Sequence, residues 1–247
     1  MKFADTVHGG ERSNPSGKAI SNKILLSISD AEFALVRPHL EFQELPQGRI
    51  LHEAGMKLQF AYFPNRGLIS LVVASKAARG VEAGVVGFEG FVGTPLAVGL
   101  FKSPLRQIVQ IAGDGCRIRA RGLTSVLPGT PDFQMRLSRY AVLQGMQVAE
   151  TAACNRLHEI QQRLARWLLM AQDRVGAGAL PITHEFLAVM LGTDRPSVTL
   201  AAGALQRKKA IEYTRGNVQV LNRKKLEGSA CTCYRAIQEL NGDLGLR

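Results

Sequence analysis

The sequence has few of the residues, and none of the long apolar runs, that several classes of protein require. Among 247 residues there are 4 cysteines and 1 tryptophan, and aromatic residues make up 6%. A membrane-spanning helix needs about 18 or more consecutive apolar residues, whereas the apolar stretch 81–98 is interrupted by Glu82, Glu89 and several glycines. We therefore predict that the chain does not span a membrane. Residues 1–20 carry charges and no apolar block, so we expect a cytoplasmic protein.

The few cysteines are scattered, apart from one C-x-C near the end of the chain. They are Cys116, Cys154, Cys231 and Cys233, and a reducing cytosol would keep them as thiols. A zinc or iron–sulfur site usually needs two close pairs of ligands, or one pair with histidines nearby in sequence. Because the five histidines are far apart, we expect no disulfide, no metal site and no iron–sulfur cluster.

The motifs of common enzyme classes are also missing. The sequence has no H-x-H metal motif, no G-x-S-x-G nucleophile elbow and no G-x-x-x-x-G-K-[ST] phosphate loop. We therefore predict that the chain is not an enzyme. A barrel-type enzyme is the alternative, because small antiparallel β-barrels also occur in metalloenzymes.

Positive charge is in excess, with 31 Lys and Arg against 20 Asp and Glu and a net charge of +11. This excess favours a polyanionic partner.

The length suggests two domains. Residues 1–22 are rich in Gly, Ser, Asn and Lys without an apolar period, and we predict a flexible tail there.

Residues 23–130 are predicted to form the first domain. A short helix is expected at 29–40, capped by Ser29 or Asp30. From 42 to 123, short apolar runs alternate with evenly spaced glycines, which is typical of a small antiparallel β-barrel or jelly roll. Parallel strands would need helices between them, and the intervals contain no helical pattern.

Residues 131–157 are predicted to form a long helix, with a hinge at 155–158. Two apolar stripes run along it, and the first passes through Met135, Val142, Met146 and Ala149. A helix that is apolar on two sides needs two partners. We expect one stripe to pack on the barrel and the other on the same helix of a second subunit. A helix buried on both sides within one subunit is the alternative.

Residues 158–247 are predicted to be a winged helix-turn-helix domain. Within 183–205, Ala188 provides a small side chain where two helices cross, Gly192 suits a left-handed turn, and Val198 fits the core. Asp194 is placed to cap the second helix, and Pro196 lies in its first turn.

A basic wing follows the second helix. Residues 211–214 and 218–222 alternate like two strands around an R-G-N turn. Residues 195–225 contain eight Lys or Arg residues and one Glu. This pattern favours duplex DNA. RNA is less favoured because few aromatic side chains are available for base stacking, and an ordinary solvated surface is the alternative.

Taken in order, these parts resemble the CRP/FNR family of bacterial transcription regulators over about residues 25–235. The most specific segments are LPITHEFLAVMLGTDRPSVT and RGNVQVLNRKKLE, and the barrel matches through G-R-I at 48–50, Gly55, Tyr62-Phe63 and Gly67. The resemblance implies an α+β fold with a cyclic-nucleotide-binding-like β-barrel (jelly roll), a long dimerisation helix and a C-terminal winged helix-turn-helix. It also implies a homodimer that binds palindromic double-stranded promoter DNA and contacts RNA polymerase.

The resemblance places Arg195 where the family has an arginine that reads guanine, and a guanidinium fork matches guanine O6 and N7. Pro196 and Leu200 stand where relatives have a glutamate and an arginine, so we expect a different preferred sequence. Phosphate contacts are expected from Thr183, His184, Thr193, Ser197 and Arg215, and further DNA contacts from Thr199, Arg207 and Lys208.

The expected effector site departs from the family's pattern. Members that bind cAMP use a glycine-glutamate pair and an arginine-serine pair on the barrel. Here Glu89 and Arg106 match, Gln107 replaces the serine, and the stretch between them is lengthened and hydrophobic. These three residues are our candidate effector site, for an unidentified small molecule other than cAMP, or for none. A cyclic-nucleotide-binding regulatory protein that acts through protein partners is the second alternative.

Overall fold

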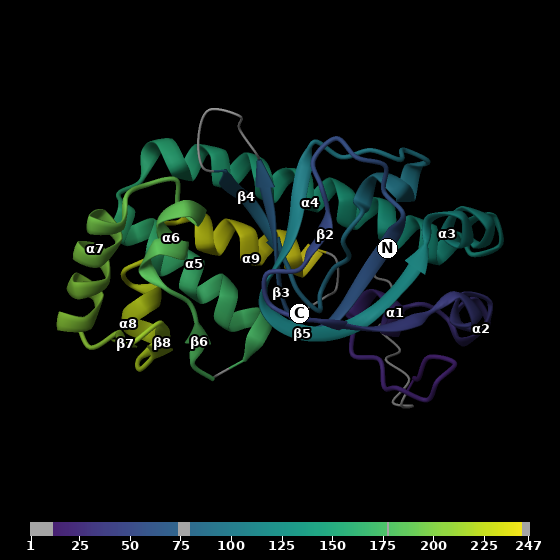
Figure 1. Cartoon of the computed structure of the whole chain (residues 1–247), viewed down its shortest axis with the longest axis horizontal. Helices are drawn as coiled ribbons and strands as arrows, with labels where there is room; N and C mark the ends of the chain where they lie inside the picture. Colours follow the sequence, from purple (N-terminus) through teal and green to yellow (C-terminus); the bar gives the residue numbers. More distant parts are fainter. Residues whose placement is uncertain (1–11, 74–79, 177, 244–247) are drawn as a thin grey trace.

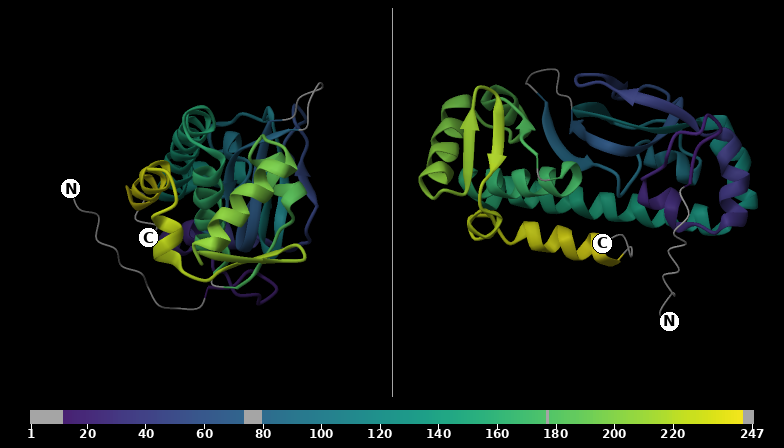
Figure 2. Two further views of the ribbon diagram at one scale, coloured as in Figure 1. Left: turned by 90° about the vertical axis from the view of Figure 1, so that its left-hand side faces the viewer. Right: turned by 90° about the horizontal axis from the view of Figure 1, so that it is seen from below.

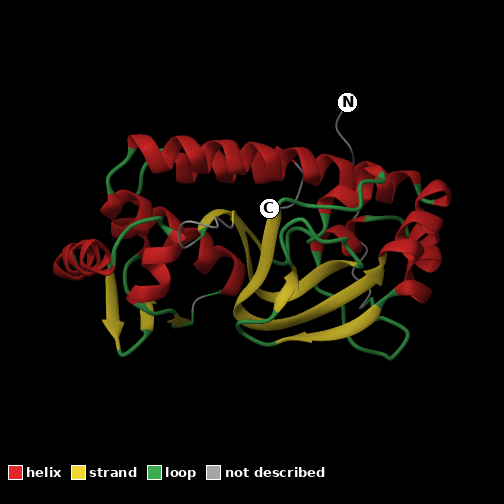
Figure 3. Cartoon of the chain, turned by 45° about the horizontal axis from the view of Figure 1, so that its top comes forward, coloured by secondary structure: helices red, strands yellow, loops and turns green. Residues whose placement is uncertain are grey.

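The computed structural model describes residues 12–73, 80–176 and 178–243. It shows an elongated molecule with a curved antiparallel sheet towards one end and a winged helical domain at the other (Figure 1). The long helix α4 (Pro131–Leu157) runs alongside both parts (Figure 3). The predicted α+β architecture is confirmed. No helix in the described part of the chain has the length and apolar character of a membrane span.

The sheet of the first domain is antiparallel, as the glycine-punctuated region predicts. Its strands are β1 (Glu41–Leu45), β2 (Ile50–His52), β3 (Phe60–Val73), β4 (Val81–Val86) and β5 (Leu105–Arg119). The order is β1-β5-β3-β4, and β2 also pairs with β5. The two long strands, β3 and β5, therefore form the centre of the sheet, and irregularities in their register bend it.

Glycine lets β3 and β5 approach closely where they bend. A Cβ atom on Gly113 would lie 2.1 Å from the carbonyl oxygen of Arg66, a distance that no side chain tolerates. Gly67, on the facing strand, has a φ of +93°, in the region that favours glycine. Glycines at these positions are therefore required by the curvature of the sheet.

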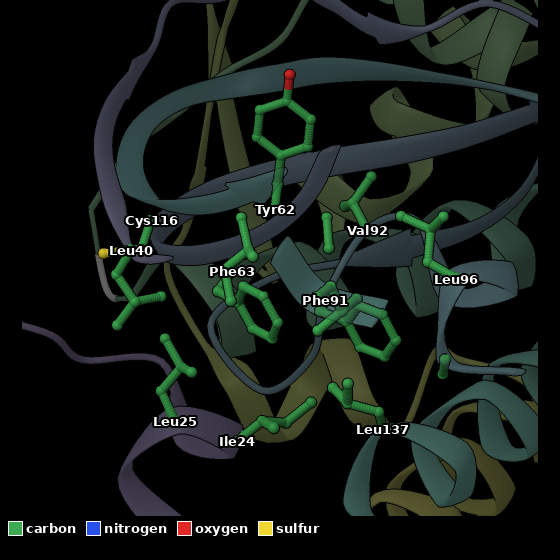
Figure 4. Packing of buried hydrophobic residues seen from close by; sticks show 14 of the residues in the cluster. Ile24, Leu25, Leu40, Tyr62, Phe63, Phe91, Val92, Leu96, Cys116 and Leu137 are labelled. Atoms are coloured by element: carbon green, nitrogen blue, oxygen red, sulfur yellow. The ribbon is translucent and has the colours of Figure 1, made fainter. Parts of the chain in front are cut away.

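Short helices and α4 cover the apolar face of the sheet. The short elements are α1 (Lys23–Ser27), α2 (Asp30–Val36), α3 (Ala120–Val126) and the 3-10 turns Arg37–His39, Thr94–Val98 and Leu127–Gly129. Ser29 caps α2, as predicted. In the core, the rings of Phe63 and Phe91 stack with centroids 5.5 Å apart, and Leu137 of α4 packs into the same cluster (Figure 4).

The segment 12–22 differs from the predicted flexible tail. Asn22 is fully buried; it caps α1 and donates to the carbonyl oxygens of Pro64 and Gly90. Arg12 donates to the carbonyl oxygen of Leu25. These long-range contacts order the segment, and local composition does not reveal them. The rest of the predicted tail, residues 1–11, lies outside the described residues.

The second domain begins with α5 and ends with a helix that returns to α4. Its elements are α5 (Ile160–Val175), β6 (Leu180–Pro181), α6 (His184–Met190), α7 (Arg195–Arg207), β7 (Ile211–Thr214), β8 (Asn217–Val220), α8 (Arg223–Glu227) and α9 (Cys233–Asp243). Helix α4 continues to Leu157, so the break that we predicted at 155–158 lies at His158 and Glu159, which are extended. Helix α9 lies beside α4 (Figure 2).

Helix α5 joins the two domains through one continuous hydrophobic cluster. Leu164, Trp167 and Leu168 of α5 pack both with the helix-turn-helix and with sheet residues that include Leu68 and Ile111. Trp167 is almost fully buried. The winged domain is therefore held against the outer face of the sheet and is not a separate body on a free linker.

Two buried carboxylates of the sheet domain bind α5. The Trp167 indole donates to Oε1 of Glu82 at 2.6 Å, and Ser70 donates to Oε2 of the same carboxylate. Arg174 forms an ion pair with Glu89 at 2.7 Å, with both side chains nearly inaccessible. Burial raises the pKa of Glu82 to about 7, although these two hydrogen bonds act to lower it. Glu82 is therefore the pH-sensitive group of this contact.

The raised pKa of Glu82 predicts that stability falls as pH rises from 5 to 8. Between its ordinary pKa of 4.5 and about 7, folded Glu82 keeps a proton that the unfolded chain has lost, so its contribution disappears as the pH passes 7. Glu82→Gln keeps an acceptor for Trp167 but does not titrate. We expect the variant to lose less stability than the wild type over this range, by on the order of 1–3 kcal/mol.

Denaturant unfolding at pH 5 and pH 8 measures this difference. Glu212→Gln, which changes an exposed glutamate of the wing, is the control and should behave like the wild type. An identical pH dependence in Glu82→Gln and the wild type would show that Glu82 does not titrate as described.

Candidate nucleic-acid interface

Helices α6 and α7 form the predicted helix-turn-helix. Gly192 adopts a φ of +59° in the turn between them, as its position predicts. The Asp194 carboxylate accepts a hydrogen bond from the backbone N–H of Ser197 at 2.7 Å and so caps α7. Val198 is fully buried beneath the turn. Arg163 of α5 donates to the carbonyl oxygen of Leu191, which ties the turn to the domain's central helix.

The first turns of α7 present an exposed face. Arg195, Pro196 and Thr199 are exposed, and the side chain of Leu200 is 75% exposed although it is apolar. Ser197 is half-buried at the cap. Helix α7 lies at the outer end of the molecule, on the side away from the sheet (Figure 1). Its N-terminal half is therefore accessible to a large partner.

His184, from which we expect a phosphate contact, is buried against the wing. Its ring stacks on Tyr213 with centroids 3.9 Å apart, and its Nδ1 lies 3.0 Å from the hydroxyl of Thr199. Burial, and then the charge of Arg195, lower the pKa of His184. In this conformation His184 supports α7 and the wing.

The remaining predicted DNA contacts surround α7. Thr183 is exposed and caps α6 through its hydroxyl, and Thr193 is half-buried in the turn. Arg207 and Lys208 are exposed at the end of α7. Arg215 is exposed at the tip of the wing, where it has a φ of +39° and precedes Gly216 in a two-residue turn. The polar and basic side chains thus lie on both sides of the exposed face.

The turn of the helix-turn-helix touches the sheet domain. A Cβ atom on Gly192 would come within 3.3 Å of Val81 at the start of β4. Gln110 of β5 donates to the sulfur of Met190 at 3.5 Å. These contacts join the turn and the end of α6 to the sheet domain, whereas the N-terminal face of α7 stays exposed.

The structure does not bring the three candidate effector residues together. Glu89 is buried in the ion pair with Arg174. Arg106 forms a partly exposed ion pair with Glu53 at 2.9 Å. Gln107 is buried, and its Oε1 atom has no hydrogen-bond partner among the described residues. Sequence reasoning missed Arg174 because it lies 85 residues from Glu89.

The predicted dimer stripe is exposed along α4. Met135, Val142, Met146 and Ala149 all lie on the solvent side, and Val142 is 59% exposed. The opposite face, which includes Phe133 and Leu137, is buried in the core of the first domain.

One group of side chains in the described part of the chain could hold a metal ion. It consists of Cys154, His158, Cys231 and Cys233, whose candidate ligand atoms all lie within 4.8 Å of one another. Sequence reasoning missed it because the two pairs are far apart in the chain. The available signal was the C-x-x-x-H spacing at the end of α4 together with the later C-x-C.

Comparisons with known proteins agree with this geometry. Residues 162–228 match the Crp-like helix-turn-helix domain. No curated protein matches the chain. Solved structures with the same fold include FixK2 from Bradyrhizobium japonicum, with 12% identity, a TM-score of 0.67, and coverage of 78% of this chain and 98% of that one.

Two further structures show the same fold. A CRP/FNR family transcriptional regulator from Thermus thermophilus is 21% identical, with a TM-score of 0.62, covering 77% of this chain and 98% of that one. The c-di-GMP-responsive global regulator CLP from Xanthomonas campestris is 14% identical, with a TM-score of 0.62 and coverage of 78% and 99%. The chain therefore has the fold and the Crp-like helix-turn-helix domain of the CRP/FNR family of transcription regulators.

Proposed function

We propose that the chain is a homodimeric transcription regulator that binds a palindromic site in double-stranded DNA through α7. The exposed N-terminal face of α7, with Arg195 at its start and basic residues on both sides, is the observation that carries this proposal. A helix of this kind fits the major groove, and Lys and Arg around it attract the phosphates. We infer RNA polymerase as a further partner and the cytoplasm as the location, from the family's general role.

Within this interface, Arg195 is proposed to read a guanine. Its guanidinium group is exposed at the first position of α7, where it can form two parallel hydrogen bonds with O6 and N7. Pro196 has no N–H and Leu200 is apolar, so the neighbouring positions favour contact with a thymine methyl group over a second polar readout. Arg207, Lys208 and Arg215 would contact phosphates without regard to sequence.

The exposed stripe of α4 supports the homodimer. Its apolar members face solvent in a single chain, and the same stripe on a second copy would cover them. Two copies related by a twofold axis present two α7 helices, which explains why we expect a palindromic site.

An effector other than cAMP fits the sheet domain better than cAMP does. Glu89 is already paired with Arg174, and Arg106 is paired with Glu53 on another part of the surface. A ribose phosphate would find neither side chain free in this conformation. Calorimetry with cAMP tests this proposal, and micromolar binding that is lost in Arg106→Ala would contradict it.

We also propose a non-enzymatic role, because buried polar pairs such as Glu89 with Arg174 join structural elements to one another. The alternative of a regulatory protein that acts only through protein partners leaves the exposed basic face of α7 and the wing without a role. A wild-type protein that binds a small molecule but has no affinity for DNA would favour that alternative.

We expect Arg195→Ala to reduce sequence preference, because the variant loses the guanine contact. The difference in binding free energy between the selected palindrome and scrambled DNA should shrink by about 1–3 kcal/mol. Arg215→Ala should weaken binding to every sequence and reduce the salt slope by about one unit. Salt titrations on a selected palindrome and on scrambled DNA measure both effects.

Arg121→Ala is the matched control for these titrations. Arg121 is an exposed arginine on α3, at the far end of the molecule from α7, and its loss should leave both titrations unchanged. If Arg195→Ala lost the same affinity for both DNAs and Arg215→Ala changed the sequence preference, the wing would be the part that reads the sequence.

Placing glutamates in the stripe should separate the dimer. In a variant with Val142→Glu and Met146→Glu, four carboxylates would meet across the seam, where burial and like charge both oppose association. We expect analytical ultracentrifugation to give the mass of one chain.

The control for this experiment carries Gln47→Glu and Gln219→Glu, which add the same charge at exposed positions outside α4. It should sediment as a dimer. If the stripe variant sediments like the wild type, the dimer forms through another surface or does not form.

A further inference from the structure

Three cysteines and a histidine meet where the long helix joins the second domain. Cys154 lies in the last turn of α4, His158 in the break before α5, Cys231 just before α9, and Cys233 at its first position. The sulfur atoms of Cys154 and Cys231 are 3.4 Å apart, and Cys233 Sγ lies 3.4 Å from His158 Nδ1. All four candidate ligand atoms lie within 4.8 Å of one another.

The local structure explains why these side chains converge. Cys154 and His158 are four residues apart at the end of a helix, so both project from the same side. In the C-x-C segment, Cys231 and Cys233 are buried and form a small cluster with Cys154 that is separate from the two large cores. Three buried thiols with few apolar neighbours contribute little to packing, so the cluster calls for another explanation.

The spacing suits one tetrahedral ion. Zn–S bonds of about 2.3 Å and Zn–N bonds of about 2.0 Å place neighbouring ligand atoms roughly 3.5–3.8 Å apart. The observed separations of 3.4 Å to at most 4.8 Å bracket this range. Three cysteines and one histidine are also a usual ligand set for structural zinc, whose four positions are filled by protein. A cluster of several metal atoms would need its ligands further apart.

Positive charge near the cluster favours thiolates. Three thiolates and one Zn²⁺ ion carry a net charge of −1, and Arg166 of α5 is buried beside them, where it donates to Thr151. The charge of Arg166 would therefore offset the net charge of the bound cluster.

We propose that Cys154, His158, Cys231 and Cys233 bind one structural Zn²⁺ ion. This proposal replaces the expectation, drawn from sequence spacing, that the chain has no metal site. The ion would bind the start of α9 to the end of α4 and to the break before α5. It would thereby fix the direction in which the DNA-binding domain leaves the dimer helix. The proposal does not depend on the effector or on the DNA sequence bound.

Metal analysis of the full-length protein tests the proposal. The protein is stripped with a chelator under reducing conditions, reconstituted with Zn²⁺ or Co²⁺, and freed of unbound metal. We expect one ion per chain, and a Co²⁺ spectrum with thiolate charge-transfer bands and the strong visible bands of a tetrahedral site. Chelation should lower the unfolding temperature, and Zn²⁺ should restore it.

Ligand variants identify the residues. Cys231→Ser should lose the ion, whereas Cys116→Ser, which changes a buried free cysteine of the sheet, should keep it. Cys233→His retains four ligands, so it should still bind Co²⁺ with weaker charge-transfer bands even if Cys231→Ser fails to fold.

Two results would overturn the proposal. One is a wild type that binds no Zn²⁺ or Co²⁺ after reconstitution, and the other is an unchanged Co²⁺ spectrum in Cys231→Ser.

Discussion

The position of the DNA-binding domain depends on the double burial of α5. One side of this helix completes the core of the helix-turn-helix, and the other packs on the outer face of the sheet. Two buried carboxylates secure the contact, Glu82 through Trp167 and Glu89 through Arg174. An unpaired buried charge costs several kcal/mol, so the ion pair of Glu89 with Arg174 does not separate unless both groups gain water or new partners. Any movement of α7 relative to the sheet must therefore rearrange this interface.

This constraint would give the sheet domain a route to influence the proposed DNA binding. In the family's cAMP-binding members a glutamate at the position of Glu89 faces the nucleotide, whereas here it faces α5. A small molecule that altered β4, or the loop that carries Glu89, would act directly on the helix that holds the helix-turn-helix. On the opposite side, α4 supplies the proposed dimer seam, and the cluster around Cys154 lies where α4 ends. Seam, sheet and α7 are thus linked through one helix junction.

The sequence predicted those parts of the structure that residues close together in the chain determine, such as turns, helix caps and the ends of helices. The turn at Gly192, the Asp194 cap, the wing around Arg215 and the extent of α4 all follow from residues close together in the chain. The sequence could not show that residues 12–22 are ordered, that Glu89 pairs with Arg174, or that the cysteines form a cluster. Each of these features joins segments that only the tertiary fold brings together. The support that His184 gives to α7 was also missed, since its burial depends on Tyr213 of the wing.

We expect two copies of α7, held by paired α4 helices, to read two related half-sites in DNA. Selection of bound fragments from a random double-stranded library, followed by sequencing, tests this expectation. It should yield an enriched inverted repeat whose half-sites are centred about 34–36 Å, or a multiple of that distance, apart, with two chains bound to each fragment. Enrichment of a single unpaired motif bound by one chain, or no enrichment above the input library, would contradict it.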